Sequence, residues 1–295
     1  MSRMENGNSA MHEYPDKKTG KAGRMEENME MGDYIGEDGL IYCGVCHEPK
    51  QKRFEDSGIL AGQVHHVMCR CERERHAKEE ARQRAEERAR HVDELRRDGF
   101  LSRTMRDWTF AKDNGQNPQM TAAKRYVANW EQMKEKNIGL LLWGDVGCGK
   151  SYLAGAIANA LIDQEIAVRM TNFSAIINDL SGTFEGRNQY LDKLCSYPLL
   201  IIDDFGMERG TEYGLEQVYS VIDGRYRSGK PLIVTTNLTL TEMRNAADTA
   251  HKRIYDRVLD MCVPILCKGD SFRKKTAEEK LEAAKNMLYG NKEGR

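Results

Sequence analysis

The sequence has no long apolar segment. Its longest apolar runs, 138–143 (interrupted by Gly139) and 197–202, are far shorter than the roughly 20 residues that span a bilayer. The N-terminal region also lacks the apolar core of a secretory signal. We therefore expect a cytoplasmic protein with no membrane partner.

The chain also carries almost no net charge. The 295 residues include 45 Lys and Arg against 46 Asp and Glu, so any nucleic-acid site must be a local basic patch. Eight cysteines occur without an export signal, which favours reduced thiols or a bound metal over a disulfide framework.

Residues 1–38 contain no Leu, Val, Phe or Trp. Such a segment cannot bury enough apolar surface to offset its chain entropy, so we expect a disordered tail, either plainly solvated or a partner-binding arm. Residues 72–97 alternate Glu and Arg around a stripe of small and apolar residues. The spacing predicts a helix that is either a solvated spacer or a docking surface, with its stripe at Ala77, Ala81, Ala85, Ala89, Val92 and Leu95.

Residues 100–270 alternate short apolar runs with helical patterns. This alternation predicts an α/β fold with a parallel sheet covered by helices on both faces. The expected strands are 139–143, 166–170, 199–202, 232–235 and 263–267. The expected helices are 151–162, 173–180, 214–226 and 252–261, and a further helix is expected after Arg273.

A phosphate-binding loop follows the first of these strands. The segment fits G-x-x-x-x-G-K-[ST], with a strand before it and a helix after it. Its glycines let backbone N–H groups converge on phosphates, Lys150 reaches the β- and γ-phosphates, and the Ser151 hydroxyl ligates Mg²⁺. The predicted ATP-binding residues are Gly144, Asp145, Val146, Gly147, Cys148, Gly149, Lys150 and Ser151.

Polar residues end two further predicted strands. Asp203 would hold Mg²⁺ together with Ser151, and Asp204 would orient the attacking water. Asp204 is shorter than the Glu that many ATPases use, which favours slow hydrolysis or a nearly inactive switch. Asn237 either contacts the γ-phosphate or caps the helix expected at 239–247.

Four cysteines precede the charged helix. Cys43-x-x-Cys46 is a typical zinc-knuckle arm, and Cys69-x-Cys71 is a less usual second pair. We expect all four thiolates on one structural Zn²⁺. Replacement of one cysteine by a nearby histidine stays open, the candidates being His47, His65 and His66.

From about Cys43 to Arg273 the chain resembles the DnaC/DnaI-type replicative helicase loaders, AAA+ ATPases related to the IstB-type transposition helpers. The motifs that carry the resemblance are CGVC, CRC, DWTF, GDVGCGKS, LLIIDDFG, LIVTTNL, RIYDRV and DSFRKK. The resemblance implies that Arg257 is an arginine finger acting on a neighbour's ATP, Arg273 the sensor II arginine and Asn237 sensor I. Trp108 and Phe110 match a region near the adenine, although packing explains them equally well.

The resemblance implies a bacterial or phage-encoded loader that places a hexameric DnaB-type helicase on single-stranded DNA and self-associates with ATP. The expected organisation is a tail at 1–38, a zinc-binding, helicase-interacting module at 39–98, an AAA+ ATPase domain at 99–275 and a C-terminal helix or tail at 276–295. Two alternatives remain: a transposition helper, and an adaptor that binds ATP without hydrolysing it.

Overall fold

The computed structural model describes residues 29–54, 62–113, 115, 117–181, 186–206, 211–269 and 272–289. The chain divides into two compact units, residues 1–86 and 87–295. The division falls inside the charged helix, before the boundary at 98/99 that the sequence suggested. Each unit is described by itself.

The first unit holds two short hairpins and the beginning of helix α1 (Arg70–Gly99). In the first hairpin, β1 (Tyr34–Ile35) pairs antiparallel with β2 (Ile41–Tyr42), and in the second, β3 (Gln51–Arg53) pairs with β4 (Val64–His66). The expected disordered tail is therefore wrong for residues 29–38. Polar contacts order this part, because the carboxylate of Asp33 accepts from the Gly44 amide and pairs with Lys50. Residues 1–28 lie outside the described residues.

The second unit contains a parallel sheet of five strands in the order β6-β7-β8-β5-β9. The predicted parallel sheet is confirmed, and most strand bounds differ from the expected ones by a residue or two. The exception is the strand that ends in two acids, which continues beyond Ile202 to Phe205. The strands are β5 (Gly139–Trp143), β6 (Val168–Thr171), β7 (Leu199–Phe205), β8 (Leu232–Thr236) and β9 (Cys262–Leu266).

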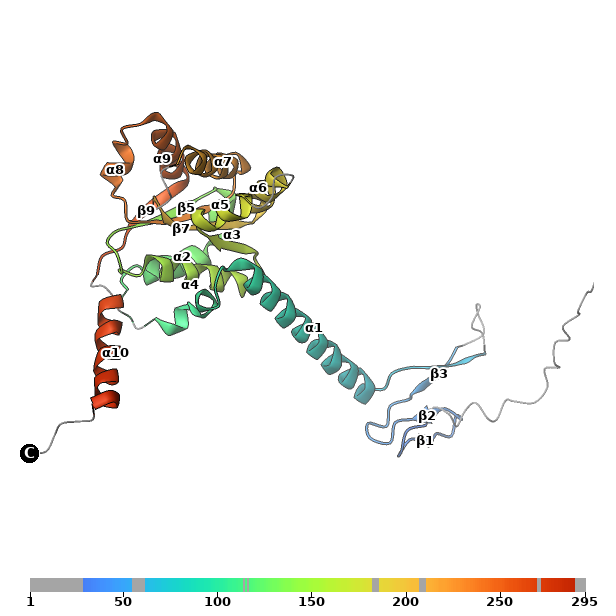
Figure 1. Cartoon of the computed structure of the whole chain (residues 1–295). Helices are drawn as coiled ribbons and strands as arrows, with labels where there is room; N and C mark the ends of the chain where they lie inside the picture. The colour runs from blue at the N-terminus through green and yellow to red at the C-terminus, as the bar shows by residue number, and fades with distance from the viewer. Residues whose placement is uncertain are drawn as a thin grey trace, which may run out of the picture. The chain divides into compact units, whose positions relative to one another are not determined.

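Helices cover both faces of the sheet (Figure 1). Successive strand residues point to opposite faces, so Leu140 and Leu142 join one core while Leu141 joins the other. The first core lies against α2 (Met120–Ala128), α3 (Trp130–Glu135) and α4 (Lys150–Ile162). The second lies against α5 (Phe173–Ser181), α6 (Arg187–Ser196), α7 (Glu212–Ser228), α8 (Leu240–Arg244) and α9 (Thr249–Met261).

Helices α2, α3 and α6 were not expected from the sequence. A signal for α2 and α3 was present, since apolar residues recur at helical spacing and become buried at Met120, Ala123, Tyr126, Val127 and Trp130. Two 3₁₀ turns, η2 (Thr104–Asp107) and η3 (Phe110–Lys112), lie between α1 and α2.

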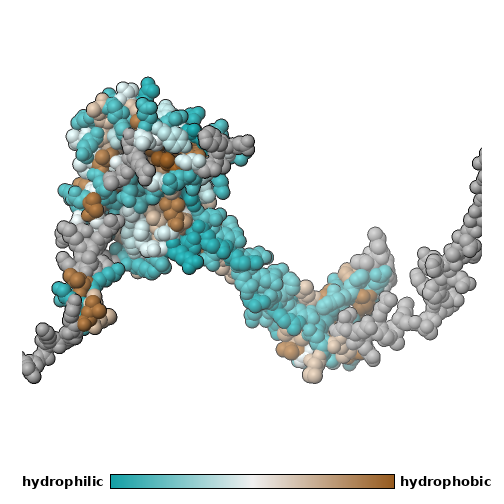
Figure 2. Space-filling model, viewed as in Figure 1, coloured by the Kyte–Doolittle hydropathy of each residue, from teal (hydrophilic) through white to brown (hydrophobic). Residues whose placement is uncertain are grey.

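The stripe of α1 has two different environments. Ala77, Ala81, Ala85 and Ala89 are exposed, and the helix surface is hydrophilic along this part (Figure 2). Val92 and Leu95 instead pack against the first core of the second unit. Arg96 strengthens this end by donating to Asn159 and pairing with Asp163.

The C-terminal helix α10 spans Phe272–Tyr289. Arg273 lies in its first turn, but its side chain is outside the described residues, so the expected sensor II role stays a prediction. Within the described part of the chain, every helix is too short or too polar to cross a membrane.

Candidate nucleotide and metal sites

The phosphate loop connects β5 to α4 at the carboxyl edge of the sheet. Gly144, Gly147 and Gly149 have φ values of 141°, 88° and 91°, which only glycine adopts readily. Gly144 also lies very close to the backbone of Cys267, since a Cβ atom on residue 144 would come within 2.2 Å of the Cys267 oxygen. The loop therefore requires glycine for two reasons, its positive φ values and the nearby end of β9.

Lys150 lies at the centre of this site and is almost fully buried. Its Nζ donates to the carbonyl oxygens of Gly144 and Asp145, at 2.8 and 2.7 Å, and to Oδ1 of Asn237 at 2.8 Å. The loop lysine and the tip of β8 are therefore in direct contact. An ammonium group held here can neutralise the charge of bound phosphates.

Asn237 does not cap the next helix. Thr239 is the N-cap of α8 and forms a capping box with Glu242. The Asn237 side chain instead accepts a hydrogen bond from Lys150, and its contact with the γ-phosphate stays a prediction.

Asp203 and Ser151 meet beside the loop. The Ser151 hydroxyl hydrogen-bonds the Asp203 carboxylate, and Oγ1 of Thr235 donates to the same carboxylate at 2.6 Å. Burial raises the pKa of Asp203, and the bonds from Thr235 and Ser151 partly oppose that rise. A hydroxyl and a carboxylate in contact form a donor set that suits Mg²⁺, so these residues fit the predicted ion.

Asp204 has an unusual backbone. Its φ is 54°, in the left-handed region, and the pairing of β7 with β8 shifts register between Ile202 and Phe205. The Asp204 amide donates to Thr235 Oγ1 at 2.9 Å, while its side chain is exposed. The bulge directs the Asp203 carboxylate into the site and the Asp204 side chain toward solvent.

Arg257 does not join this cluster. It lies on α9, which leads directly into β9, and Cys262 at the start of β9 pairs with Gly139 at the start of β5. The phosphate loop follows the other end of β5. Arg257 therefore lies toward the amino ends of the strands, away from the phosphate loop of its own chain.

Trp108 and Phe110 pack against the first core. Trp108 covers Gly155, where a Cβ atom would come within 2.5 Å of the indole, and its ring lies 6.2 Å from that of Tyr152. The Tyr152 hydroxyl donates to the Thr109 carbonyl. These contacts account for Trp108 as a packing group on α4, and Phe110 is partly buried against the same core.

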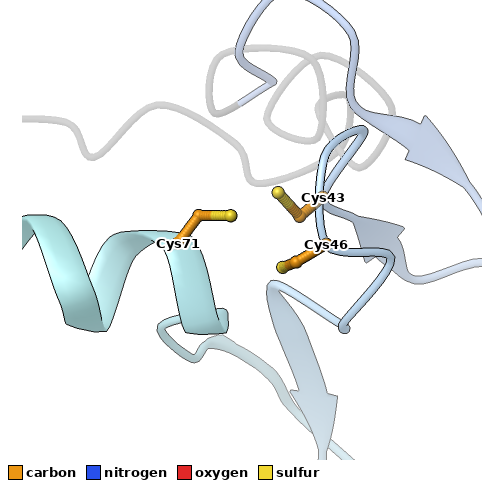
Figure 3. A group of neighbouring side chains, drawn as sticks. All are labelled: Cys43, Cys46 and Cys71. Atoms are coloured by element: carbon orange, nitrogen blue, oxygen red, sulfur yellow. The ribbon is translucent and has the colours of Figure 1, made fainter.

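The cysteines of the first unit converge. The sulfur atoms of Cys43, Cys46 and Cys71 lie within 4.8 Å of one another, and Figure 3 shows the three side chains pointing together. The buried Cys69 thiol interacts with those of Cys43 and Cys46. Backbone N–H groups of Cys71 and Glu48 lower the pKa of Cys46 to about 6. Thiolates gathered in this way suit Zn²⁺, with the backbone donors supporting the sulfur charge.

The histidines near this cluster have other neighbours. Nε2 of His65 is 3.1 Å from the Gln63 side chain, Nε2 of His66 is 3.5 Å from Glu72, and the His47 ring is tilted against Tyr34. The group of metal-ligand atoms found among the described residues contains Cys43, Cys46 and Cys71 and does not include Cys69 or a histidine. Cys69 as the fourth ligand therefore stays a prediction.

Sequence reasoning missed two buried cations. In the first unit, Lys50 is bonded to Glu30, Asp33 and Glu72. In the second, Arg225 is fully buried and donates to four backbone carbonyls, those of Cys195, Tyr197, Pro198 and Pro231. No local pattern marks either residue, because their partners are distant in sequence.

A parallel sheet with a phosphate loop after β5 and acids at the end of β7 defines a P-loop protein with the AAA+ fold. A profile of the family described as IstB-like ATP binding protein matches residues 65–280, and the chain belongs to that family. The crystal structure of the DnaC helicase loader aligns with a TM-score of 0.50 at 22% identity, over 57% of this chain and all of that one. The resemblance expected from the sequence is confirmed.

Curated relatives include a phage-like protein and helicase loaders. The chain is 32% identical over 149 residues to the phage-like element PBSX protein XkdC of Bacillus subtilis, covering 48% of this chain and 56% of that protein. It is 26% identical over 166 residues to the replicative helicase loader DnaC of Escherichia coli K12, covering 55% and 65%. The chain thus spans about half to two thirds of the length of these relatives.

Proposed function

We propose that this protein is an ATP-dependent loader of a hexameric DnaB-type replicative helicase onto single-stranded DNA. The observation that carries ATP binding is the contact of Lys150 with Asn237 beside the Ser151–Asp203 pair. The loader role is supported by relatives named replicative helicase loaders. The thiol cluster at the start of α1 supports a separate binding module in front of the ATPase unit.

The site residues have distinct tasks in this proposal. The loop amides and Lys150 bind the phosphates, and Ser151 and Asp203 hold Mg²⁺, which offsets phosphate charge when bound. Asp204 faces solvent and orients the attacking water, and Asn237 contacts the γ-phosphate. Hydrolysis is slow in an isolated chain, because its own Arg257 lies away from the phosphate loop.

Assembly completes the site. Arg257 of a neighbouring copy and Arg273 add positive charge to the transferring phosphate, so hydrolysis rises with oligomerisation or with DNA. Cys43, Cys46, Cys69 and Cys71 hold a structural Zn²⁺, and this module with its helix contacts the helicase. Binding of single-stranded DNA weakens with salt, because phosphate contacts release counterions.

Native mass spectrometry of the protein mixed with the replicative helicase of the same host tests the proposal. We expect a complex between this protein and the helicase hexamer. The amount of this complex should depend on ATP, and Lys150→Ala should change that amount. Lys134→Ala, which removes an exposed lysine on α3, is the matched control and should behave as the unaltered protein. Absence of a complex under all conditions contradicts the loader proposal.

The family membership favours one other function, that of a transposition helper. A preference for double-stranded DNA together with no helicase complex would support it. ATP binding with no hydrolysis, even on DNA and with helicase present, would instead support an adaptor that uses ATP as a switch.

A further inference from the structure

Arg257 is held by groups from the neighbouring helix α7. Its guanidinium Nη2 lies 2.6 Å from Oδ1 of Asp223, and its centre lies 4.8 Å from the ring of Tyr219 and 5.8 Å from that of Tyr226. Positions 219, 223 and 226 are spaced by four and three residues, so they share one face of α7. One carboxylate and two rings therefore restrain a single guanidinium.

The restrained arginine is not closed off from solvent. The side chains of Arg257 and Asp223 are 25% and 19% exposed. A guanidinium has five N–H donors, and a contact with one carboxylate oxygen leaves others for a second anion. The arrangement differs from a purely structural buried cation such as Arg225, which is fully buried among carbonyl groups.

The surroundings carry a positive charge on balance. Oδ2 of Asp223 accepts from Nε of Arg227 at 3.0 Å, so two arginines share one carboxylate. A groove of about 800 Å³ beside Asp223 is lined by two acids, Asp192 and Asp223, and by the cations Arg227 and Lys230. With Arg257, which pairs with Asp223, the cations of this set outnumber the two acids by one. This balance favours an approaching anion such as the triphosphate of a neighbouring copy.

We propose that Asp223 is a positioning residue for Arg257, fixing its guanidinium against Tyr219 and Tyr226 in the orientation that reaches the ATP of a neighbouring copy. The inference rests on the proposed role of Arg257 and adds the residue that orients it. A long arginine side chain loses much rotamer freedom when it is immobilised. A carboxylate that restrains it beforehand removes part of that cost from the transition state.

The test is a complementation assay between two defective variants. Arg257→Ala supplies an intact phosphate loop without the arginine, and Lys150→Ala supplies the arginine without an intact loop. Mixed together, they should restore ATP hydrolysis above that of either variant alone. The measurement is then repeated with donors that carry Lys150→Ala together with Asp223→Asn, Asp223→Glu or Asp192→Asn.

The Asp223→Asn donor should lower the restored kcat by about 10- to 100-fold, as expected for a misoriented catalytic group. The KM for ATP should not change, because the ATP-binding copy has all its own residues apart from Arg257. Asp223→Glu should recover part of the loss, since it keeps the carboxylate. Asp192→Asn removes an exposed acid that lines the same groove and should leave the restored rate unchanged.

The outcomes separate the two proposals. If the Asp223→Asn donor restores hydrolysis as well as the Lys150→Ala donor, Asp223 is not a positioning residue, while Arg257 keeps its role. If no donor restores hydrolysis, Arg257 does not act between copies, and both ideas fail. Equal association of all donors with the Arg257→Ala copy, measured by sedimentation in ATP, excludes loss of assembly or folding as the cause.

Discussion

The two units of this protein are held together by different interactions. The described residues of the first unit bury few apolar side chains, namely Ile41 and the cysteines Cys43 and Cys69. The second unit has two extended apolar cores, one on each face of its sheet. A unit with so little apolar burial requires crosslinks, a metal or ion pairs to be stable, whereas the sheet unit does not.

Buried charge illustrates the same contrast. Burial would lower the pKa of Lys50, but its bonds to Asp33, Glu72 and Glu30 outweigh that effect and raise it. Lys50 thereby ties residues 30–33 to the first turn of α1. Arg225 in the second unit instead donates to backbone carbonyl groups, and burial lowers its pKa to about 10. In the first unit, ion pairs to Lys50 hold separate segments together. In the second unit, Arg225 holds segments together by donating hydrogen bonds to their backbone carbonyls.

The largest effect is expected from breaking the cysteine cluster. Cys46→Ser should unfold the described part of the first unit, 29–54 and 62–86, while the sheet unit stays folded, because metal binding supplies on the order of 10 kcal/mol to such small sites. Hydrogen exchange should show lost protection at β2, β3 and the start of α1, with β5 to β9 unchanged.

The control for that prediction is Cys195→Ser, which alters a thiol in the second unit that is not part of the cluster. It should leave protection of the first unit intact. Unchanged protection in Cys46→Ser, together with no zinc released by a chelator, would show that the cluster does not depend on a metal.

The next effect concerns Arg225. Arg225→Met should lower the free energy of unfolding of the sheet unit by about 3–5 kcal/mol, because several buried carbonyls lose their donors. Urea unfolding followed by the fluorescence of the tryptophans measures the change. Arg227→Met, which removes an exposed arginine of the same helix, should cost less than about 0.5 kcal/mol. Equal stability of the two variants would contradict the role given to Arg225.

A smaller difference is expected along α1. Leu95→Ala should destabilise the sheet unit by about 1–2 kcal/mol, less than for a fully buried leucine, since Leu95 is only partly buried. Ala85→Ser, on the exposed part of the same stripe, should change the stability of either unit by less than about 0.5 kcal/mol. Thermal unfolding of both variants measures the contrast, and a large loss in Ala85→Ser would reveal a packed surface there.

The smallest effect is a pH dependence that distinguishes the units. Burial raises the pKa of Asp203, so this carboxylate gains its proton early as the pH falls. For Asp33, burial opposes ionisation, but bonds from Lys50 and the Gly44 amide dominate and lower the pKa. The stabilisation from Asp33 is therefore present above its unfolded pKa of about 4 and is lost only as the pH falls through its lower folded value.

Mg²⁺-dependent ATP affinity should consequently weaken on acidification while the first unit is still folded. The loss cannot exceed about tenfold per pH unit for one proton. Titration of ATP binding with and without Mg²⁺ measures it, with Asp203→Asn as the variant in which the Mg²⁺-dependent slope disappears. A slope that persists in Asp203→Asn would assign the titration to another group.

Prediction from sequence succeeded where a function requires residues in consecutive order. The phosphate loop needs Gly144, Gly149 and Lys150 at fixed spacing, and the sheet needs continuous apolar strands, so both were visible. The bulge that separates Asp203 from Asp204 was not, since it depends on how β7 pairs with β8. Ordering of residues 29–38 was missed because it depends on polar contacts with Lys50 rather than on apolar content.

By itself the sequence determined the parallel sheet, the phosphate loop and the family, because each of these depends on local order and periodicity. Only the tertiary structure decided that Lys150 meets Asn237 and that Arg257 pairs with Asp223 instead of joining its own phosphate loop. The physical reason is that strand order and helix packing bring together side chains separated by tens of residues. A short sequence pattern therefore does not predict those contacts.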